Sequence, residues 1–398
     1  MGVKNWGNKR MSKRARAREL GIIIGELPAG PHNAITDVAG VRVGHVTLIE
    51  GEGALVPGVG PVRTGVTAIW PHAGDPFRDK AAAWVHRLNG FGEVTNADQV
   101  REMGVLETPI LLTGTQNVPR VADGFLDWVF AHDPDLGVNT WGPTPLVAEC
   151  SDQYLSDVRG RHVLSEHVRA ALDNAASGPV AEGGVGGGTG MGCCEFKGGI
   201  GTSSRVLPAA AGGYTLGALV MSNFGRRENL VVDGVPVGRA LRDWEPAAAG
   251  PAADPERAGS SIIIVVATDA PLNSRQLERI SVRAGGGLAR AGGLYSTSSG
   301  DFVIAFSTTN ITPHNPQSRS LRQSVVAESI LAGHNWPSQP PINHLFQAAL
   351  EATEEAILNS MFAAETMVGR DGHVRHAIPI EEVTEILRRH GRGGSGSG

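Results

Sequence analysis

The sequence predicts an α/β protein in which helices cover a mixed β-sheet. Short apolar runs bounded by Gly and Pro recur between residues 19 and 260, which is typical of strands. Beyond residue 260, strand-like and helix-like patterns alternate. A hairpin signal in the first part indicates that the sheet is not purely parallel. Together these observations favour a mixed sheet covered by helices, which could also be split into two stacked sheets in a layered sandwich.

The elements before residue 240 follow from local patterns. Four apolar runs are expected to be strands: 66–70, 108–114, 144–149 and 214–223. Amphipathic periodicity predicts helices at 116–131 and 165–177. At 229–238, Asp233-Gly234 lies between apolar flanks, which predicts a β-hairpin.

The chain then passes through a segment unlikely to pack, 243–259, which is rich in Ala, Pro and Gly. Six consecutive apolar residues follow, Ile262 to Ala267, and predict a strand over 261–268 that is buried on both faces. The remaining expected elements are a helix at 274–291, a strand at 302–309 and helices at 318–333 and 343–366.

Composition limits the classes of function. The 398 residues are 41% apolar and 19% charged, as in a globular protein with a substantial core, and the net charge of −5 gives no general attraction to nucleic acid or anionic membranes. No apolar run reaches the length of a transmembrane helix. The three cysteines are an odd number and contain no C-x-x-C motif, which favours a reducing compartment such as the cytoplasm.

The two ends are expected to lie outside the domain. Residues 1–24 are predicted to be a basic flexible tail, with a nucleic-acid-binding arm as the alternative that nothing else supports. Residues 25–380 are predicted to form a single domain. The Gly/Ser-rich end, 391–398, has the composition of a linker or tag.

Ser261 stands where the Ala/Pro/Gly-rich segment meets the buried strand. If the chain were cut before it, the new α-amine would lie beside the hydroxyl and could act as its base. Ser261 would then be a nucleophile that needs no separate histidine. The plain structural alternative is a serine at a strand edge.

Other motifs give no cofactor or metal. The glycine cluster at 182–192 contains no phosphate-binding loop, and Lys197 is followed by Gly198 rather than Ser or Thr. With the second glycine turn at 197–205, it is expected to let backbone pass close to backbone or to a substrate. His72 and His86 are expected to be solvated or core residues, because no histidine spacing fits a metal site. No G-x-S-x-G motif is present.

Four polar residues are further candidates for the site. Three of them lie at the ends of predicted strands, and the fourth is a tyrosine, a rare residue type in this sequence. Asn223 ends an apolar strand and could direct an amide N–H at an oxyanion, or could simply cap the strand. Ser299 and Asp301 precede another buried strand, where the alternative is a polar turn. Tyr154 is one of only three tyrosines, and its alternative is a half-buried aromatic ring.

Taken together, these residues resemble a known family, from about Gly25 to about Pro379. The stretches that carry the resemblance are AGPHNAITDVAGVRVGHVTL (29–48), VRTGVTAIWPH (62–72), LNGFGEVT (88–95), LETPILLTGT (106–115), GPVAEGGVGGGTGM (178–191), FKGGIGTSSR (196–205), SNFGRR (222–227), SIIIVVATDAPL (261–272), SGDFVIAFST (299–308) and EATEEAILNSMFAAETMVGRDGH (351–373). The family is that of the DmpA-like L-aminopeptidase/D-amidase-esterases and β-peptidyl aminopeptidases, which are self-processing hydrolases with an N-terminal serine.

The resemblance implies an α/β/β/α sandwich with the architecture of N-terminal-nucleophile hydrolases and no cofactor. It implies a cut before Ser261 into an α piece, 1–260, and a β piece, 261–398, which stay associated and commonly assemble as a homotetramer. It places Asn223 in the oxyanion hole and Tyr154 at the reacting carbonyl. Ser299 and Asp301 would orient and tune the nucleophile and its amine.

Some positions depart from the family pattern. The residue before the cut is usually Gly or Asn, but here Ser260 follows Gly259, so a cut after Gly259 would expose Ser260 instead. The stretch ECSDQYL also departs, at Ser151 and Gln153. Glu149 and Asp152 flank Tyr154 in the sequence and are candidates for binding a substrate's free ammonium.

The expected activity is removal of N-terminal residues from short peptides, amides or esters, with β-peptides and D-Ala derivatives among the candidates. Three alternatives stay open. Ornithine acetyltransferases and nylon-oligomer hydrolases have related architectures but cut before a threonine. An uncleaved, non-catalytic homologue would act as a binding protein.

Overall fold

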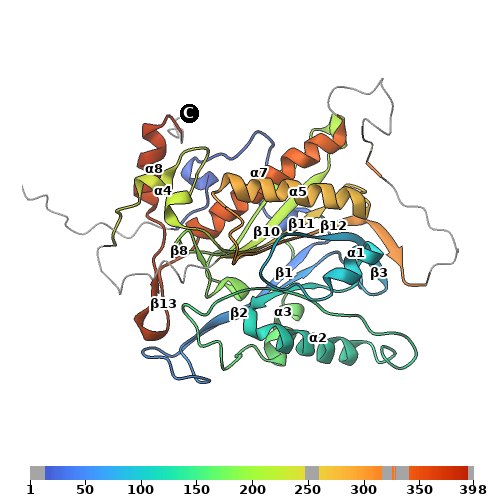
Figure 1. Ribbon diagram of the computed structural model, residues 1–398. Coiled ribbons are helices and arrows are strands. Elements are labelled where there is room, and N and C mark those ends of the chain that lie inside the picture. Colours follow the sequence, from blue (N-terminus) through green and yellow to red (C-terminus); the bar gives the residue numbers. More distant parts are fainter. Residues whose placement is uncertain (1–13, 247–259, 316–324, 327, 329–339, 393–398) are drawn as a thin grey trace, which may run out of the picture.

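The computed structural model describes residues 14–246, 260–315, 325–326, 328 and 340–392. They form four layers, in which two helices cover one sheet, a second sheet stacks below it, and two further helices cover the second sheet (Figure 1). The predicted α/β/β/α sandwich is therefore confirmed.

The upper sheet has six strands in the order β4-β3-β12-β11-β10-β9, and the lower has four in the order β1-β2-β5-β6. The upper strands are β4 (Val105–Leu106), β3 (Asp79–Gly90), β12 (Gly300–Pro313), β11 (Ser261–Thr268), β10 (Thr215–Asn223) and β9 (Gly199–Val206). The lower strands are β1 (Arg42–Glu50), β2 (Val62–Trp70), β5 (Ile110–Gly114) and β6 (Leu146–Cys150).

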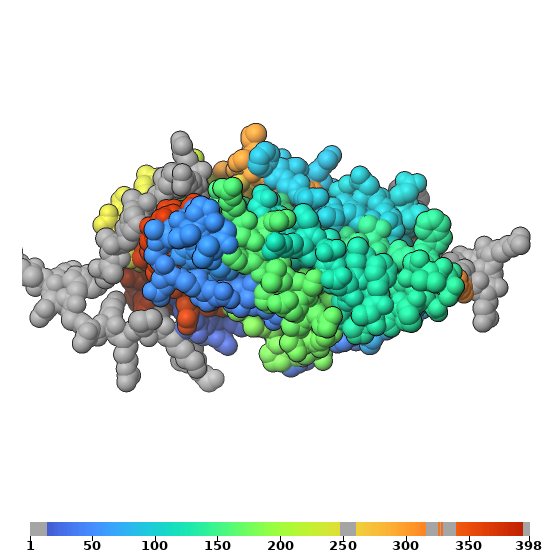
Figure 2. Space-filling view, turned by 90° about the horizontal axis from the view of Figure 1, so that it is seen from below, coloured from blue at the N-terminus to red at the C-terminus, as the bar shows by residue number. Residues whose placement is uncertain are grey.

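The main helices lie on the outer faces of the sheets. α5 (Ser274–Arg290) and α7 (Pro341–Phe362) cover the upper sheet, and α2 (Val118–His132) and α3 (Ser165–Asp173) cover the lower one. From below, the surface is formed largely by α2, α3 and the loops beside them, coloured teal to green (Figure 2). Smaller elements are α1 (Ala97–Met103), α4 (Val237–Ala240), α8 (Ile380–Arg389) and the short strands β7 (Gly192–Cys193), β8 (Phe196–Lys197), β13 (Met367–Val368) and β14 (Val374–Arg375).

Three apolar cores separate the four layers. One fills the space between α5, α7 and the upper sheet, one lies between the sheets, and one lies beneath the lower sheet. Because β11 faces two of these cores, Ile262 and Ile264 point into the upper core while Ile263 and Val265 point into the middle one. The unbroken apolar run thus matches the strand that is buried on both faces.

β11 is central to the upper sheet. It pairs antiparallel with β10 and parallel with β12. Because parallel neighbours need a crossover, α5 carries the chain from the end of β11 back to the start of β12. The starts of β11 and β12 therefore lie side by side, together with the end of β10.

Four sequence expectations differ from the structure or lie largely outside the described residues. The Asp233-Gly234 turn connects a single bridge between Val232 and Val235 rather than two strands, and α4 begins at Val237. Most of the expected helix at 318–333 and most of the 243–259 segment lie outside the described residues, as do 393–398 of the expected linker-like end. Residues 325, 326 and 328 are described and are not helical. Among the described residues, no helix is long and apolar enough to cross a membrane.

Part of the expected flexible tail is packed. Arg14 donates to the carbonyls of Met361 and Ile378, and Arg18 pairs with the buried Glu355. Ile22 and Ile24 are each only 1% exposed. Residues 14–24 are thus held by side chains that alternate between cationic and apolar anchors, whereas the first thirteen residues lie outside the described range.

Candidate active site

Ser261 is the first residue of β11 and lies at the end of the upper sheet. Its side chain is oriented by the neighbouring strand, because the backbone N–H of Gly300 donates a hydrogen bond to Ser261 Oγ at 3.2 Å. On the other side of the peptide bond, the carbonyl oxygen of Ser260 accepts a hydrogen bond from Ser299 Oγ. The structure therefore brings together the expected nucleophile, the bond before it and a hydroxyl donor.

Ser299 and Asp301 lie at the start of β12. The parallel register sets Asp301 opposite Ile262, and the Ser299 hydroxyl lies 2.5 Å from Asp301 Oδ1. Burial raises the pKa of Asp301 to about 6, although hydrogen bonds from Ser299 and the Ile262 backbone act in the opposite direction. The second carboxyl oxygen, Oδ2, has no hydrogen-bond partner among the described residues.

The Ser299 hydroxyl has one proton but lies beside two oxygen atoms that can accept it, the Ser260 carbonyl oxygen and Asp301 Oδ1. It can donate to the Ser260 carbonyl while contacting Asp301 only if Asp301 carries a proton and donates to Ser299 Oγ. Because the pKa of Asp301 is about 6, this protonated form predominates only below that pH. In that form, the Asp301 carboxyl donates to the Ser299 hydroxyl, and the Ser299 hydroxyl donates to the Ser260 carbonyl that precedes Ser261.

Asn223 ends β10 and is the antiparallel register partner of Ser261. Its side-chain amide is fixed at both ends, since Oδ1 accepts from Gly192 N at 2.9 Å and Nδ2 donates to the Ser151 carbonyl at 3.0 Å. These bonds use only one of the two Nδ2 protons. Because Asn223 lines the cavity beside Ser261, the second proton is available to an oxygen bound there.

Tyr154 lines the same cavity, and its ring contacts His373 and Arg375. His373 stacks on it with 4.6 Å between the ring centroids and 10° between the planes. The Arg375 guanidinium lies 4.0 Å from the Tyr154 ring centroid. Cation–π and stacking contacts therefore orient the phenol.

The two candidate carboxylates differ in what they face. Glu149, on β6, lines the cavity, accepts from Glu93 N at 3.0 Å and from the Thr115 hydroxyl, and has a pKa raised by burial. Asp152 does not line the cavity. Its carboxyl accepts from Thr64 Oγ1 at 2.5 Å, and burial raises its pKa to about 6. The structure thus brings Glu149, but not Asp152, to the position expected for binding an ammonium.

The cavity has a volume of about 730 Å³, large enough for a short peptide. Ser261, Asn223, Tyr154 and Glu149 share it. Its wall also includes Phe91, Thr115 and Arg375, which sequence reasoning missed. No local pattern marks these three residues, because each reaches the site from a distant loop or strand.

The glycine cluster at 182–192 fulfils the close-approach expectation, whereas residues 199–205 of the expected second glycine turn form strand β9. Gly190 and Gly192 line the cavity. A Cβ on Gly188 would lie 2.5 Å from the backbone N of Ile200, and one on Gly190 would lie 2.4 Å from the carbonyl of Arg63. Only glycine fits at these two points. Backbone therefore passes close to backbone and forms part of the cavity wall.

The two histidines singled out in the sequence, His72 and His86, do not line this cavity. His72 is buried, with Nε2 2.6 Å from the Asp79 carbonyl, and His86 lies half-buried on β3 with a pKa lowered by burial. Within the described ranges, no group of three His, Cys, Asp or Glu side chains is placed to hold a metal ion.

Comparison with known proteins places this site in context. A family model described as peptidase family S58 matches residues 33–375. The β-peptidyl aminopeptidase BapA of Sphingosinicella xenopeptidilytica is 43% identical over 378 residues, which are 94% of this chain and 91% of that protein. BapA of Sphingosinicella microcystinivorans is 42% identical over 385 residues, 95% of this chain and 93% of its own.

Solved structures agree with the fold. The PH0078 protein of Pyrococcus horikoshii superposes with a TM-score of 0.86 at 48% identity, covering 95% of this chain and all of that one. The L-aminopeptidase D-Ala-esterase/amidase of Ochrobactrum anthropi superposes with a TM-score of 0.84 at 40% identity, covering 95% of this chain and 99% of its own. The latter is described as a prototype for the serine aminopeptidases and as a variant of the N-terminal-nucleophile hydrolase fold.

Proposed function

This chain belongs to peptidase family S58, and we propose that it becomes an active serine aminopeptidase by cutting its own backbone before Ser261. The family and its homologues are serine-type aminopeptidases of the N-terminal-nucleophile kind. The observation that carries the proposal is the meeting of Ser261, the Ser260 carbonyl and the Ser299 donor at one end of the upper sheet.

In the first step, Ser261 Oγ attacks the carbonyl carbon of Ser260. The bond from that carbon to the Ser261 nitrogen breaks, the hydroxyl proton passes to the departing nitrogen, and an ester forms at Oγ. The Ser299 hydroxyl stabilises the negative charge that develops on the Ser260 oxygen. Water then hydrolyses the ester and leaves a carboxylate on Ser260 and a free amine on Ser261.

In the second stage, the new amine is the base. An α-amine has an ordinary pKa of about 7.7–8.0, so it can accept the Oγ proton near neutrality. Oγ attacks the substrate carbonyl, and the second Nδ2 proton of Asn223 stabilises the oxyanion, with the Tyr154 hydroxyl beside it. The amine returns its proton to the leaving group, and water releases the acyl group from Ser261.

The substrate carries a free ammonium and is short. Glu149 is the only one of the two candidate carboxylates that lines the cavity, so we assign the ammonium to it. Two of the relatives are β-peptidyl aminopeptidases, which makes short β-peptides and β-amino acid amides the first substrate class to test. Amides and esters of D-Ala are the second class, from the name of the Ochrobactrum enzyme.

The test uses adjacent serines as variant and control. Ser261→Ala should remain a single chain in intact-mass measurement under denaturing conditions and should hydrolyse no amide or ester substrate. Ser260→Ala keeps the nucleophile and should still give two fragments, the smaller beginning at Ser261 by N-terminal sequencing. A cut, active Ser261→Ala protein would overturn the assignment. A fragment beginning at Ser260 would move the nucleophile by one residue.

We also propose that the cut pieces stay together in a homotetramer and act in the cytoplasm. The family resemblance supports the assembly, and so do three exposed apolar side chains on the lower layer, Phe130, Val138 and Trp141, of which Trp141 is 87% exposed. The three buried thiols are compatible with a reducing compartment. Light scattering on the cut protein tests the assembly, and a monomeric mass would contradict it.

A further inference from the structure

Lys197 is a buried cation that the chemistry above does not use. It lies on β8, is fully buried, and is the cross-strand partner of Gly192 on β7. Its Nζ donates to three backbone carbonyls, those of Gly188 at 3.2 Å, Met191 at 2.9 Å and Gly198 at 2.7 Å. An ammonium has three N–H donors, so these bonds use all of them.

This cation has no counter-charge nearby. In the part of the chain that the structure describes, no carboxylate forms an ion pair with Lys197, and the charged side chain that acts on it is Arg375. Burial, and after it Arg375, lower the pKa of Lys197 to about 7, while Cys193 acts in the opposite direction. An isolated buried charge is costly, and a lysine serving only as apolar filling could be replaced by methionine at lower cost. A lysine ammonium in a fully buried position therefore points to a use for its charge.

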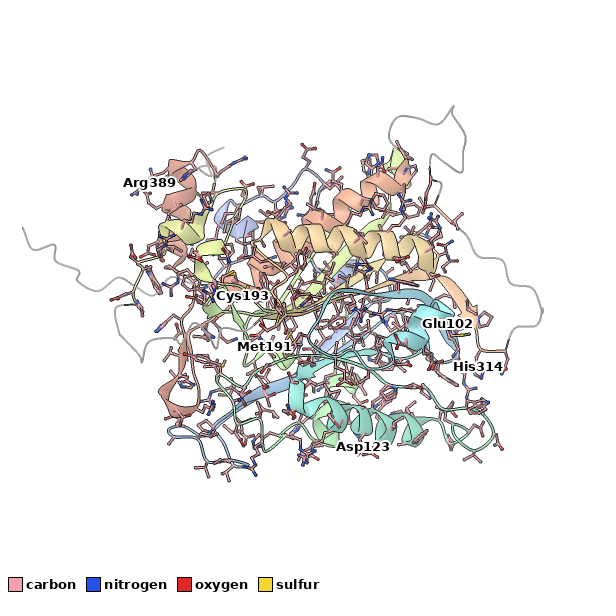
Figure 3. The ribbon with its side chains drawn as sticks, viewed as in Figure 1. Glu102, Asp123, Met191, Cys193, His314 and Arg389 are labelled. Carbon is pink, nitrogen blue, oxygen red and sulfur yellow. The ribbon has the colours of Figure 1, made fainter. Side chains whose placement is uncertain are left out.

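Two amide groups connect Lys197 to the cavity. The Met191 carbonyl that accepts from Nζ belongs to the same peptide unit as the Gly192 N–H. That N–H donates to Asn223 Oδ1 at 2.9 Å, and Oδ1 belongs to the same amide as the Nδ2 donor. Figure 3 labels Met191, which supplies this carbonyl, and Cys193, the second residue of β7, between the upper helices and the lower layer.

Hydrogen bonds in such a series polarise one another. A positive charge at one end withdraws electron density through each carbonyl and strengthens the next N–H donor. The final donor here is the Nδ2 group of Asn223, which lines the cavity and has one proton that the bond to the Ser151 carbonyl does not use. The bonds to the Gly188 and Met191 carbonyls also hold the 188–192 turn, whose Gly192 N–H contacts the Asn223 amide.

We propose that Lys197 is a positioning residue for hydrolysis, and that its ammonium polarises and orients the Asn223 amide through the Met191–Gly192 peptide unit. The inference rests on the proposed oxyanion role of Asn223. It predicts an effect that appears in the transition state, where negative charge forms on the substrate oxygen, and not in the binding of the uncharged ground state.

The experiment is a double-mutant cycle on the full chain, assayed as cut protein with the number of active sites taken from the amount of β piece. Lys197→Met keeps the length and removes the charge and donors, and Lys197→Gln keeps two donors without charge. We expect kcat to fall by about 10- to 100-fold in both, less than the roughly 10²–10³-fold expected for Asn223→Ala. KM should change by less than about twofold.

The cycle separates polarisation from simple support of the fold. In the Asn223→Ala background, Lys197→Met should cost almost nothing further, because the group through which it acts is gone. Additive losses, a loss confined to KM, or full activity of Lys197→Gln would overturn the proposal. If Asn223→Ala does not cut itself, the cycle cannot be completed. The proposal is then tested by the Lys197 variants alone, which should lose kcat while KM stays nearly unchanged.

Failure of the underlying function would look different. If Asn223→Ala retains full kcat, the oxyanion assignment itself is wrong, whatever Lys197 does. If neither Lys197 variant accumulates as folded protein, with a cooperative thermal transition as the measure, Lys197 serves folding and the proposal is overturned.

Discussion

Glu149 and Asp152 show how narrowly position decides the role of a carboxylate. Glu149 lies within β6, where alternation along the strand turns its side chain to the cavity. Asp152 follows the end of the strand, and its side chain packs against Gly114 and Gly190. A Cβ on either glycine would collide with the Asp152 side chain. Both side chains are buried, but only Glu149 meets the space where a substrate binds.

This contrast predicts a pH dependence of substrate binding. An ionised Glu149 binds the substrate ammonium, and burial raises its pKa above the ordinary value of about 4.3. KM should therefore rise as pH falls, with a midpoint above that value, while kcat/KM falls in parallel. Glu149→Gln should raise KM at neutral pH by at least about tenfold, as expected for loss of a charge-assisted bond, and remove this pH dependence.

Asp152→Asn is the matched control, because it removes a buried carboxylate that does not face the substrate. Its KM and the pH dependence of KM should equal those of the parent protein. Initial-rate measurements from pH 4.5 to 8 on a short peptide amide decide the matter. A KM that stays pH-independent in the parent protein would remove Glu149 from ammonium binding.

The residues of the site differ in how far sequence reasoning could reach them. The junction makes Ser261 a candidate, and the family resemblance favours it as the nucleophile. The structure places Ser261 beside Asn223, Ser299 and Asp301 through strand register. Thr115 and Lys197 could not be predicted, since their roles exist only through contacts with distant backbone or side chains. In the sequence, Lys197 drew attention only because the residue after it, Gly198, rules out a phosphate-binding loop.

At the scale of elements, α5 carries three successive glycines that face different surroundings. Gly286 is half-buried, and a Cβ there would meet only the Leu350 side chain, at 3.4 Å. Gly287 is buried, and a Cβ there would lie 2.5 Å from the backbone carbonyl of Leu350 in α7. The close approach of α5 to α7 therefore depends on Gly287 and not on Gly286.

The same substitution should thus have opposite effects at adjacent positions. Gly286→Ala should raise the free energy of unfolding by up to about 1 kcal/mol, because alanine favours the helix and the contact is ordinary. Gly287→Ala should lower it by about 1–3 kcal/mol, because α7 must move away. Urea denaturation of both variants provides the measurement. Equal effects at the two positions would show that the α5–α7 spacing is not fixed by Gly287.

The strands divide into those that sequence patterns reveal and those they hide. β5, β6, β10 and β11 are apolar runs, and their predicted ranges agree with the structure to within two residues. β9 was missed because polar side chains occupy both of its buried faces: Thr202, Ser203, Ser204 and Arg205 are all fully buried. Their hydroxyl and guanidinium groups form hydrogen bonds with the backbone and with Glu351 and Glu355. These bonds make polar side chains stable in a buried strand, and a search for apolar runs cannot reveal them.

At the scale of the whole molecule, the two expected pieces are interleaved rather than adjacent. In the upper sheet, β11 and β12 belong to the piece after Ser261, but they lie between β10 and β3 of the piece before it. The buried Arg205 of β9 also pairs with Glu351 and Glu355 of α7. Separating the pieces would break two strand pairings and leave buried charges without partners.

Self-cleavage should therefore leave the fold intact. We expect the cut protein to give two masses under denaturing conditions but a single species, containing both pieces in equal amounts, under native conditions. It should unfold in one cooperative transition, because β10, β11, β12 and β3 share one sheet and cannot unfold independently. The uncut Ser261→Ala chain should elute at the same size in gel filtration. A β piece that elutes alone without denaturant, or two separate unfolding transitions, would contradict the interleaved arrangement.

Arg205→Met leaves Glu351 and Glu355 buried without their cation. This substitution should lower the free energy of unfolding of the cut protein by about 3–5 kcal/mol.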